Sequence, residues 1–552
     1  MANPSPVARC LLPVARCLFS SSSEGTAGMT RHRSASDGPR AVTIGIDLGT
    51  DTSTVAAIDP DGEPLLVPGG SLPSLAAMVD GPGGEPEILA GAEAVRVAAG
   101  PGDRLRGFKQ LMGRRFDDPE VQRLAGALPY PVVPAPNGDA WVQARGLALS
   151  PPELSARVLR ELRAAAEVYL NEPVTEAVIT VPARFDNEQR RATRDAAEIA
   201  GLEVRRLLNE PTAAVLGSGA HRGPDRRLAV CDLGAGSFDV SIVNVEQGVI
   251  EVISTSGDQF LGGDDVDRLM LDKLLDEIRR QHRLAAADAG SLQRLLDACR
   301  AAKHQLSQSP RADVAALLAV GGAAPLDYRR TVRREELEEW TESLLDLLEP
   351  PCLESVARCD LRPGDVNALL LVGGATRMPA VQRKLAGIFG RPVAAARDQA
   401  VALGAAALGA VLDGDSEGLA VLDVTSRAIG LDLGDGRYQQ VIPRNTTVPT
   451  REHKIVSTTR ASQRELELDV YEGESPVIGD NRLLGRFVCT GLPDAPAGQV
   501  MIALDFTVDV DGTLRLSATE MGTAQRPELH LRASAGLTRA HVRRLRASLS
   551  AR

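Results

Sequence analysis

The sequence predicts an α/β domain followed by an antiparallel β domain, and three features lead to this prediction. Strand-like and helix-like stretches alternate up to residue 412, which is the order of elements in an α/β domain. Residues 413–418, DGDSEG, break this pattern and mark a domain boundary. From residue 425 to about 535, short alternating strands are separated by Gly, Pro and Asn turns with no helix signal, as in an antiparallel β domain.

Length, charge and cysteine content narrow the class of protein. A chain of 552 residues is too long for one hydrophobic core, so at least two domains are expected. The net charge of −11 disfavours nucleic acid or an anionic membrane as a main partner, and no run of about 18 uncharged apolar residues predicts a membrane span. The seven cysteines are scattered without a Cys-x-x-Cys pair, which favours free thiols in a reducing compartment, and we expect a cytoplasmic protein.

Residue patterns predict the individual elements. Val42, Ile44 and Ile46 alternate with smaller residues as in a strand, and residues 151–170 form an amphipathic helix with Pro at its start. A buried strand follows at 174–183. Further elements are a helix at 184–202, a hairpin and third strand at 228–256, helices from 264 to about 306 and at 333–359, a strand from 368 that breaks at Gly373 and leads into a helix, a small-residue helix at 400–412, a hairpin with an Asp-Gly turn at 508–518, and one short helix in the last 16 or so residues.

The stretch 44–53, IGIDLGTDTS, runs from a strand into Asp47 and a Gly-Thr turn. There a carboxylate can face Mg²⁺ through water, and glycine lets backbone N–H groups approach a phosphate closely. Asp-x-Gly turns also close many ordinary hairpins, so the signal is weak alone. A second copy occurs at 229–241, AVCDLGAGSFDVS.

A third stretch, VGGATRMP at 372–379, completes the pattern. Two strand–turn–strand units can clamp a β/γ-phosphate pair from opposite sides, and a later Gly-Gly entering a helix can approach the nucleoside without a Cβ in the way. No GxxxxGK[ST] run occurs, so a Walker-type phosphate loop is not predicted.

With these three stretches the chain resembles the seventy-kilodalton heat-shock chaperones (DnaK type), within the actin/hexokinase superfamily, from about residue 42 to 536. The resemblance also rests on GFKQLMGRRF, EAVITVPARF, NEPTAA, GDQFLGGDDVD and VLDVT. It implies an α/β actin-like two-lobed ATPase domain followed by an antiparallel β-sandwich domain. The implied parts are a disordered N-terminal extension (1–41), the nucleotide-binding ATPase domain (42–417), an interdomain linker (418–424), the substrate-binding β-sandwich domain (425–536) and a short helical stub in place of the family's lid (537–552).

The resemblance also implies the residues of an ATP site. Asp47 and Asp232 would hold Mg²⁺ through its waters, and Lys109 would position the attacking water. The other implied catalytic residues are Thr50, Glu210, Ser237 and Asp239. The residues implied to contact the nucleotide are Gly49, Thr50, Asp51, Thr52, Gly234, Ala235, Gly236, Ser237, Lys303, Ser307, Gly373, Gly374, Arg377 and Asp398. In-line attack of water on the γ-phosphate would then depend on positioning and charge neutralisation.

Coupling and peptide-binding residues follow from the same resemblance. Pro182 and Arg190 would relay the nucleotide state to domain docking, while Arg206, Asn209 and Asp423 match positions that receive a J-domain co-chaperone. The linker, LAVLDV, is expected to be an apolar segment in an exposed position that binds in one nucleotide state and is free in the other. The residues implied to line a peptide groove are Leu431, Val456 and Leu466, for each of which a place in the plain core is nearly as strongly expected.

Several positions depart from the family pattern. Asp51 replaces a usual Thr, Ala235 a Gly, Arg300 a ribose-contacting Glu, and Arg184 a relay Tyr, which predicts a weaker or slower ATPase. Gly434 and Thr459 stand where the family builds an arch over the peptide. Because the chain stops within the first helix of the family's lid, fast peptide release is expected.

The resemblance implies an ATP-dependent chaperone that binds exposed apolar peptide segments and couples hydrolysis to interdomain docking. The alternative is a nucleotide-switched regulatory or scaffolding relative with weak or no ATPase and one dedicated partner. Phosphotransfer of the sugar-kinase kind is disfavoured by the linker and the β domain. The implied cofactors are ATP or ADP with Mg²⁺, and the implied partners are unfolded or extended peptide segments, a J-domain co-chaperone and a nucleotide exchange factor.

Overall fold

The computed structural model describes residues 42–550 apart from 82, 98–99, 101, 127, 283–287, 320–324, 395–398, 415–419, 433–435, 523–527 and 533–535. The predictions for residues 1–41, for Asp398 and for Gly434 lie outside the described residues. From Val42 onward the chain forms one compact unit.

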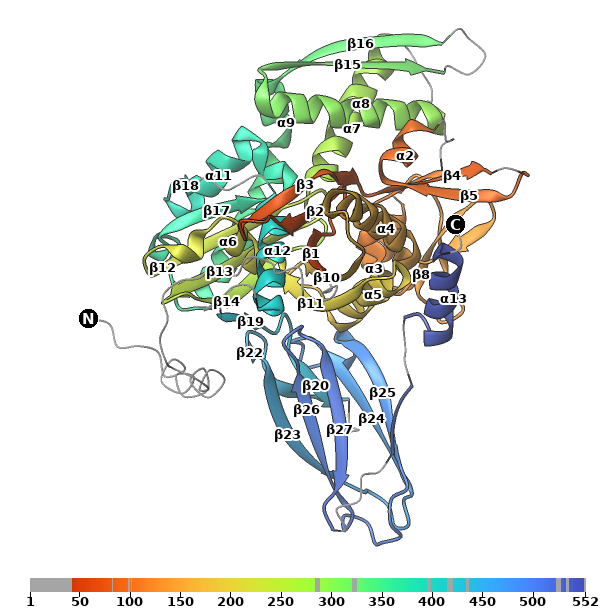
Figure 1. Cartoon of the computed structure of the whole chain (residues 1–552), viewed down its shortest axis with the longest axis vertical. Helices are drawn as coiled ribbons and strands as arrows, with labels where there is room; N and C mark the ends of the chain where they lie inside the picture. Colours follow the sequence, from red (N-terminus) through yellow and green to blue (C-terminus); the bar gives the residue numbers. More distant parts are fainter. Residues whose placement is uncertain are drawn as a thin grey trace. The chain divides into compact units, whose positions relative to one another are not determined.

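The first α/β sheet has five strands in the order β11-β10-β1-β2-β3. The strand β1 pairs parallel with β10 and antiparallel with β2, so the predicted first strand lies at the centre of the sheet. Helices α4 and α5 cover it (Figure 1). The bounds are β1 Val42–Asp47, β2 Thr52–Ile58, β3 Pro64–Pro73, β10 Val174–Val181, β11 Glu203–Asn209, α4 Pro151–Leu170 and α5 Asn187–Ile199.

The second α/β sheet has seven strands in the order β18-β17-β12-β13-β14-β19-β22. Its centre is the antiparallel run β12-β13-β14, which is the hairpin and third strand predicted at 228–256. The bounds are β12 Arg226–Leu233, β13 Phe238–Glu246, β14 Val249–Asp258, β17 Ala368–Val372, β18 Val393–Ala394, β19 Ala420–Val424 and β22 Thr447–Val448.

Most predicted helices are confirmed, and two predicted helical stretches each divide in two. Ser150 caps the predicted helix 151–170, and Asp186 caps α5 through a capping box with Gln189. The remaining helices are α2 Gly91–Arg96, α3 Pro119–Ala125, α6 Glu210–Gly217, α7 Gly263–His282, α8 Ala289–Gln308, α9 Arg334–Asp346, α10 Glu349–Ala357, α11 Pro379–Phe389, α12 Ala400–Asp413 and α13 Arg539–Ser550.

Short elements complete the α/β part. Three small sheets, β5-β4-β6, β7-β8-β9 and β15-β16, extend from it. Their strands are β4 Leu75–Asp80, β5 Pro86–Ala90, β6 Arg104–Arg106, β7 Val132–Pro134, β8 Ala140–Ala144, β9 Leu147–Leu149, β15 Arg311–Leu318 and β16 Leu326–Arg333. The 3₁₀ turns of this part are η1 Phe108–Leu111, η2 Ala220–Arg222, η3 Pro363–Asp365 and η4 Gly374–Arg377, and a fifth, η5 Ile478–Asp480, lies in the β region between β24 and β25.

The β region, as predicted, is antiparallel. A five-stranded sheet, β21-β20-β24-β25-β28, and a three-stranded sheet, β23-β26-β27, enclose one apolar core. The predicted hairpin turns at Asp511 and Gly512, where glycine takes a positive φ of 73°. The bounds are β20 Ile429–Asp432, β21 Tyr438–Ile442, β23 Thr450–Ser457, β24 Glu465–Glu472, β25 Arg482–Thr490, β26 Met501–Val508, β27 Leu514–Glu520 and β28 Glu528–Arg532.

The segment expected to be an exposed apolar linker is a strand in its described part. β19 pairs parallel with β14 and antiparallel with β22, so it joins the second α/β sheet. Asp423 and Val424 are buried. In this structure the segment is bound, not exposed, because the edge of β14 offers it backbone hydrogen bonds, which an apolar sequence pattern does not reveal.

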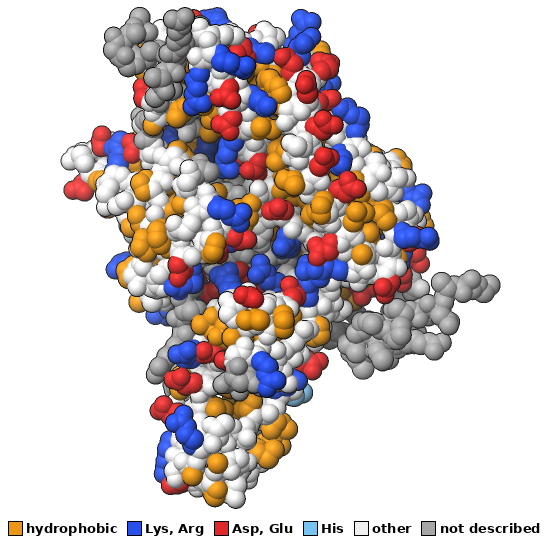
Figure 2. Space-filling view, turned by 180° about the vertical axis from the view of Figure 1, so that it is seen from behind, with side chains coloured by type: hydrophobic (Ala, Val, Ile, Leu, Met, Phe, Trp, Pro, Cys, Tyr) orange, Lys and Arg blue, Asp and Glu red, His pale blue; other side chains and the backbone are white. Residues whose placement is uncertain are grey.

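The surface carries both signs of charge. Acidic and basic side chains are interspersed over the face in Figure 2, and basic side chains gather in a hollow across its middle.

Among the described residues, no helix combines the length and the apolar content that crossing a membrane requires.

Helix α12 packs against β1 and α6 (Figure 1). The backbones approach so closely that only small side chains fit between them, which explains the small residues of this helix. A Cβ on Gly404 would lie 1.9 Å from the carbonyl oxygen of Ala213, and one on Gly45 would lie 2.1 Å from the backbone nitrogen of Ala406. Glycine is therefore required at both contacts.

We expect Gly404→Ala to lower the free energy of unfolding by about 3 kcal/mol, because the new methyl group forces two helices apart. Gly387→Ala on α11 is the matched control, since no atom lies within 4 Å of its Cβ position. The control should be neutral or gain up to about 1 kcal/mol. Urea unfolding followed by circular dichroism measures both, and equal effects would contradict the close packing.

Candidate functional site

The first glycine turn follows β1 and is fixed by its own hydrogen bonds. The backbone N–H of Gly49 donates to Ser53 Oγ at 3.1 Å, and Ser74 Oγ donates to the carbonyl of Gly49 at 2.8 Å. A Cβ on Gly49 would lie 2.1 Å from the carbonyl oxygen of Thr52. Thr50 and Asp51 are half-buried in this turn, and Thr52 is exposed.

The second turn connects β12 to β13 and places Asp232 opposite Asp239 in the strand register. The N–H of Gly234 donates to the carbonyl of Ser237 at 3.0 Å and closes the turn. The carbonyl of Gly236 accepts from Gln110 Nε2 at 3.2 Å. This bond ties the second turn to η1, which belongs to the segment that carries Lys109.

Lys109 and Glu210 form a buried ion pair. Their Nζ and Oε1 atoms are 3.1 Å apart, and each residue is less than 10% exposed. Lys109 Nζ also lies 5.6 Å from the ring centroid of Phe185. Glu210 is the first residue of α6, where the helix dipole favours a carboxylate.

Four carboxylates crowd around Lys109. Burial and the charge of Glu210 raise the pKa of Asp47 to about 7, and Thr180 Oγ1 donates to its Oδ1 at 3.2 Å. Burial also raises the pKa of Asp239 to about 7 and that of Asp232 well above its usual range. Asp239 Oδ1 is buried and accepts no hydrogen bond.

This donor set is suited to a hard cation. Carboxylate oxygens are the ligands that Mg²⁺ prefers, and Mg²⁺ usually keeps several waters. Within the described residues, no group of three or more His, Cys, Asp or Glu side chains could hold a metal ion by itself.

The third predicted stretch reaches the same place. Gly373 has a φ of 84°, and a Cβ there would lie 2.4 Å from Asp232 Oδ1, so only glycine fits. Gly374 has open space around it, and Arg377 is exposed. The structure thus brings all three glycine-containing stretches together around Asp232.

Two further predicted nucleotide contacts lie on α8. Lys303 is buried; its Nζ donates to the carbonyl of Gly263 at 2.7 Å and lies 2.9 Å from Asp267. The hydroxyl of Ser307 donates to the carbonyl of Lys303 at 3.2 Å.

The charged residues that depart from the family pattern have polar partners in the structure. Asp51 lies 3.3 Å from Arg106 Nη1, so its carboxylate has a cation beside it. Arg300 lies 3.0 Å from Asp264 and 3.2 Å from Asp267. The Arg184 guanidinium donates to the carbonyl of Gly257.

Two predicted coupling residues, Arg190 and Arg206, lie where α5 and β11 meet the β region, whereas Asp423 lies on β19 of the second α/β sheet. Arg190 donates to Asn209 Oδ1 at 2.8 Å and to the carbonyl of Asp511 at 3.1 Å, and Arg206 Nε lies 3.5 Å from Asp511. Asp423 accepts from Thr212 Oγ1 at 2.7 Å. Pro182, which directly follows β10, is buried.

Sequence reasoning missed the partners on the β region. Asp511 accepts from the backbone N–H of Leu207 at 2.9 Å and also pairs with Arg194, while Arg482 pairs with Asp186. The Asp-Gly pair at 511–512 predicted a hairpin turn from the sequence. Nothing local indicated that it contacts α5, which lies more than 300 residues earlier.

The three predicted groove residues differ in burial. Leu431 is 1% exposed and belongs to the core of the β region. Val456 and Leu466 are partly buried and pack against that core. Only these two have surface that a peptide could contact.

Glu472, at the end of β24, is buried next to Arg190, and burial raises its pKa to about 7. Arg427 and Arg190 face it with positive charge, and Glu474 and Glu188 face it with negative charge. Because the folded state holds this proton more tightly than the unfolded state, Glu472 contributes to stability in full below pH 4.5, its ordinary pKa. The contribution is lost as the pH rises through about 7, the pKa in the folded protein.

Between pH 6 and pH 8 we therefore expect the free energy of unfolding of the native chain to fall. This fall should be about 1 kcal/mol larger than in Glu472→Gln, whose amide does not titrate. Urea unfolding at the two pH values measures this difference. Glu467→Gln, on the same strand, serves as a control. Parallel pH profiles for the native chain and Glu472→Gln would contradict the assignment.

Comparison with known families agrees with this geometry. A family model described as Hsp70 protein matches residues 43–551, which is nearly the whole chain. This family has an actin-like ATPase domain and a β-sandwich, and its members are ATPases that bind ATP or ADP with Mg²⁺ and act as chaperones. The chain belongs to the Hsp70 family.

Proposed function

We propose that the protein is an ATP-dependent chaperone that binds exposed apolar peptide segments and couples hydrolysis to docking of its β region. In this proposal residues 42–417 form a two-lobed ATPase domain, 418–424 the linker and 425–536 the substrate-binding domain. The observation that carries it is the convergence of two glycine turns, Gly373 and the buried pair Lys109–Glu210 on one cluster of carboxylates.

Each part of the cluster has a role in this proposal. Asp47 and Asp232 would hold Mg²⁺ through its waters, and the bound ion would neutralise charge on the β- and γ-phosphates. Backbone N–H groups of the two turns, with Thr50 and Ser237, would cradle the phosphates. Lys109, fixed by Glu210 at 3.1 Å, would orient the attacking water, and Asp239 has a free acceptor oxygen for that water.

The nucleoside would lie against η4 and α8. Gly374 leaves open space, and Arg377 is exposed beside it. Lys303 and Ser307 contribute a buried amine and a half-buried hydroxyl. Flat approach of a base to the glycine backbone is the physical reason for assigning adenosine to this side.

The contacts of Asp511 support coupling between nucleotide and peptide. Arg190, Arg194 and Arg206 all interact with this residue at the tip of the β26–β27 hairpin. A J-domain co-chaperone that binds at Arg206 and Asp423 would compete with or alter these contacts. A nucleotide exchange factor would act by opening the two α/β sheets around the nucleotide.

A nucleotide-switched regulatory or scaffolding protein is the second candidate. It rests on the positions that depart from the family pattern, since Asp51, Ala235 and Arg300 change the residues implied to surround the nucleotide. Hydrolysis rates measured with and without an unstructured peptide and a J-domain protein separate the two. Stimulation by both supports a chaperone cycle, and stimulation by neither supports a switch.

Lys109→Met should lower single-turnover ATP hydrolysis by about 100-fold or more, with ATP binding retained, because the residue acts on the attacking water. The control is Lys384→Met, whose Nζ pairs with Asp346 and Glu349 on the surface of α9–α11. Hydrolysis in Lys109→Met at the native rate would overturn the assigned role. Isothermal titration with ATP measures the binding.

Asp511→Asn should abolish peptide stimulation of hydrolysis and leave the basal rate unchanged, because it removes the carboxylate charge that pairs with Arg194 and Arg206. Asp505→Asn is the matched control, since Asp505 pairs with Arg451 inside the β region. Equal peptide stimulation in the native chain and Asp511→Asn would show that the hairpin contact carries no coupling.

A further inference from the structure

Four buried carboxylates lie on α5 and on elements packed against it. Glu188 and Asp195 belong to α5 itself, two helical turns apart and therefore on one face. Asp139 lies in the turn between β7 and β8, and Glu472 ends β24 of the β region. Each of the four is less than 10% exposed. We call these four residues the carboxylate cluster.

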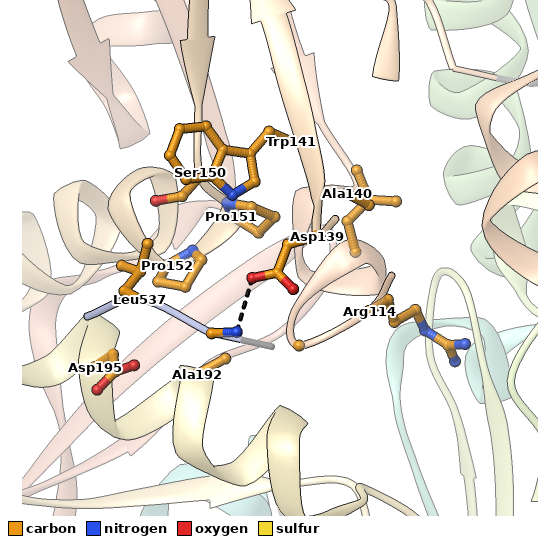
Figure 3. A pocket seen from close by; sticks show the side chains of 13 residues that line it. Arg114, Asp139, Ala140, Trp141, Ser150, Pro151, Pro152, Ala192, Asp195 and Leu537 are labelled. Carbon is orange, nitrogen blue, oxygen red and sulfur yellow. Dashed lines mark hydrogen bonds between the residues drawn. The ribbon is translucent and has the colours of Figure 1, made fainter. Parts of the chain in front are cut away.

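Each member of the cluster has one buried oxygen that accepts no hydrogen bond, namely Asp139 Oδ1, Glu188 Oε2, Asp195 Oδ2 and Glu472 Oε2. The other oxygen of Asp139 accepts from Asn137 at 2.8 Å and from the N–H of Gly536 at 2.8 Å, the latter shown by the dashed line in Figure 3. Asp139 and Asp195 line the same small cavity (Figure 3). A buried oxygen without a donor is costly when its carboxylate is ionised, and protonation removes most of that cost.

Arginines around the cluster compensate its charge only in part. Arg191 is shared among the three members that lie on α5 and on the β7–β8 turn, and its Nη1 is 3.7 Å from Glu188 Oε2. Arg539 lies 3.9 Å from Asp195 but only 2.7 Å from Glu198. The remaining charged groups that face the cluster are Arg115 and Arg482 at Asp139, and Arg190, Arg427 and Glu474 at Glu472.

The cluster changes its charge around neutral pH. Burial raises the pKa of Glu188 and of Glu472 to about 7 and that of Asp195 to about 6, and it also raises the pKa of Asp139. The negative charges of Asp139 and Asp195 add to the effect at Glu188. The charge of Glu188 in turn adds to the effect at Glu472, so the members on the two sides oppose one another's ionisation.

The cluster lies beside contacts that hold the β region on α5. Asn187 Oδ1 accepts from the N–H of Leu514 at 3.0 Å, and Arg190 Nη1 donates to the carbonyl of Asp511 at 3.1 Å. We call these two contacts the α5 seam. Two members of the cluster lie on α5 and one lies on β24, so the seam has buried carboxylates on both of its sides.

We propose that the α5 seam is a proton-gated contact: protonation of the carboxylate cluster holds the β region on α5, and ionisation of the cluster loosens it. Protonated carboxyl groups are neutral and stay out of water at little cost, whereas ionised groups gain hydration when the seam opens. Because the closed seam holds these protons more tightly than water-exposed carboxylates would, it is favoured in acid and loses this contribution as the pH rises through about 7. This goes beyond the proposed function, and neither the proposal nor its test involves a nucleotide.

Hydrogen exchange of the full chain at pH 6 and pH 8 tests the proposal. The reporter is the amide of Leu514, which the seam protects through its bond to Asn187. After correction for the intrinsic pH dependence of exchange, its protection should fall about tenfold for each group that titrates near pH 7, which is about 100-fold for Glu188 and Glu472 together.

The amides of β13, at the centre of the second α/β sheet, report unfolding of the whole chain. They should stay better protected than Leu514 at both pH values, because the seam opens without unfolding the sheet. Equal protection at the two places would show that the seam does not open by itself and would overturn the proposal.

Glu188→Gln keeps the size of the side chain and removes its titration. The fall of protection at Leu514 should then be about tenfold smaller than in the native chain. Glu203→Gln, at an exposed position of β11, is the matched control and should behave as the native chain does. An equal fall in Glu188→Gln and the native chain, or no fall in the native chain, would overturn the proposal.

Glu472→Gln covers the case in which Glu188→Gln does not fold, because it removes a titrating group from the other side of the seam. It should also make the fall at Leu514 about tenfold smaller. A fall as large as that of the native chain would overturn the proposal from this side.

Discussion

The buried charge balance around Lys109 is the constraint on which the site depends. Asp47, Asp232, Asp239 and Glu210 bring negative charge from the ends of β1, β12, β13 and β11 to one place, and burial makes each carboxylate costly. Lys109 lowers the pKa of Asp47 and Asp239 and partly compensates. Four carboxylates and one ammonium group remain in the cluster, and a bound cation would balance this excess of negative charge.

Helix α5 contacts both the β region and α13. Its first turn contacts the β region through Asp186 and Asn187, and its middle does so through Arg190 and Arg194. Its last turns receive α13 through Glu198. One polar helix thus contacts the hairpin of the β region through its middle and α13 through its last turns.

The charged residues that depart from the family pattern have partners of opposite charge in the structure. Asp51 faces Arg106, so a carboxylate next to the phosphate turn does not stand unpaired. Arg300 lies between two aspartates of α7. Such pairs of opposite charge reduce the repulsion that the substitutions suggest on their own, because a partner at about 3 Å offsets part of the cost.

The sequence by itself determined most of the elements, and it predicted the residues of a nucleotide site, many of which the structure brings together. Helix α4, the β12–β13 hairpin and the break at Gly373 follow from capping residues, period and glycine, which act over a few residues. Only the tertiary structure decided that β19 is a paired strand, that Leu431 is core, and that Asp511 and α13 meet on α5. These contacts join residues that are distant in the chain, and their energy comes from burial and charge pairing between surfaces that no local pattern encodes.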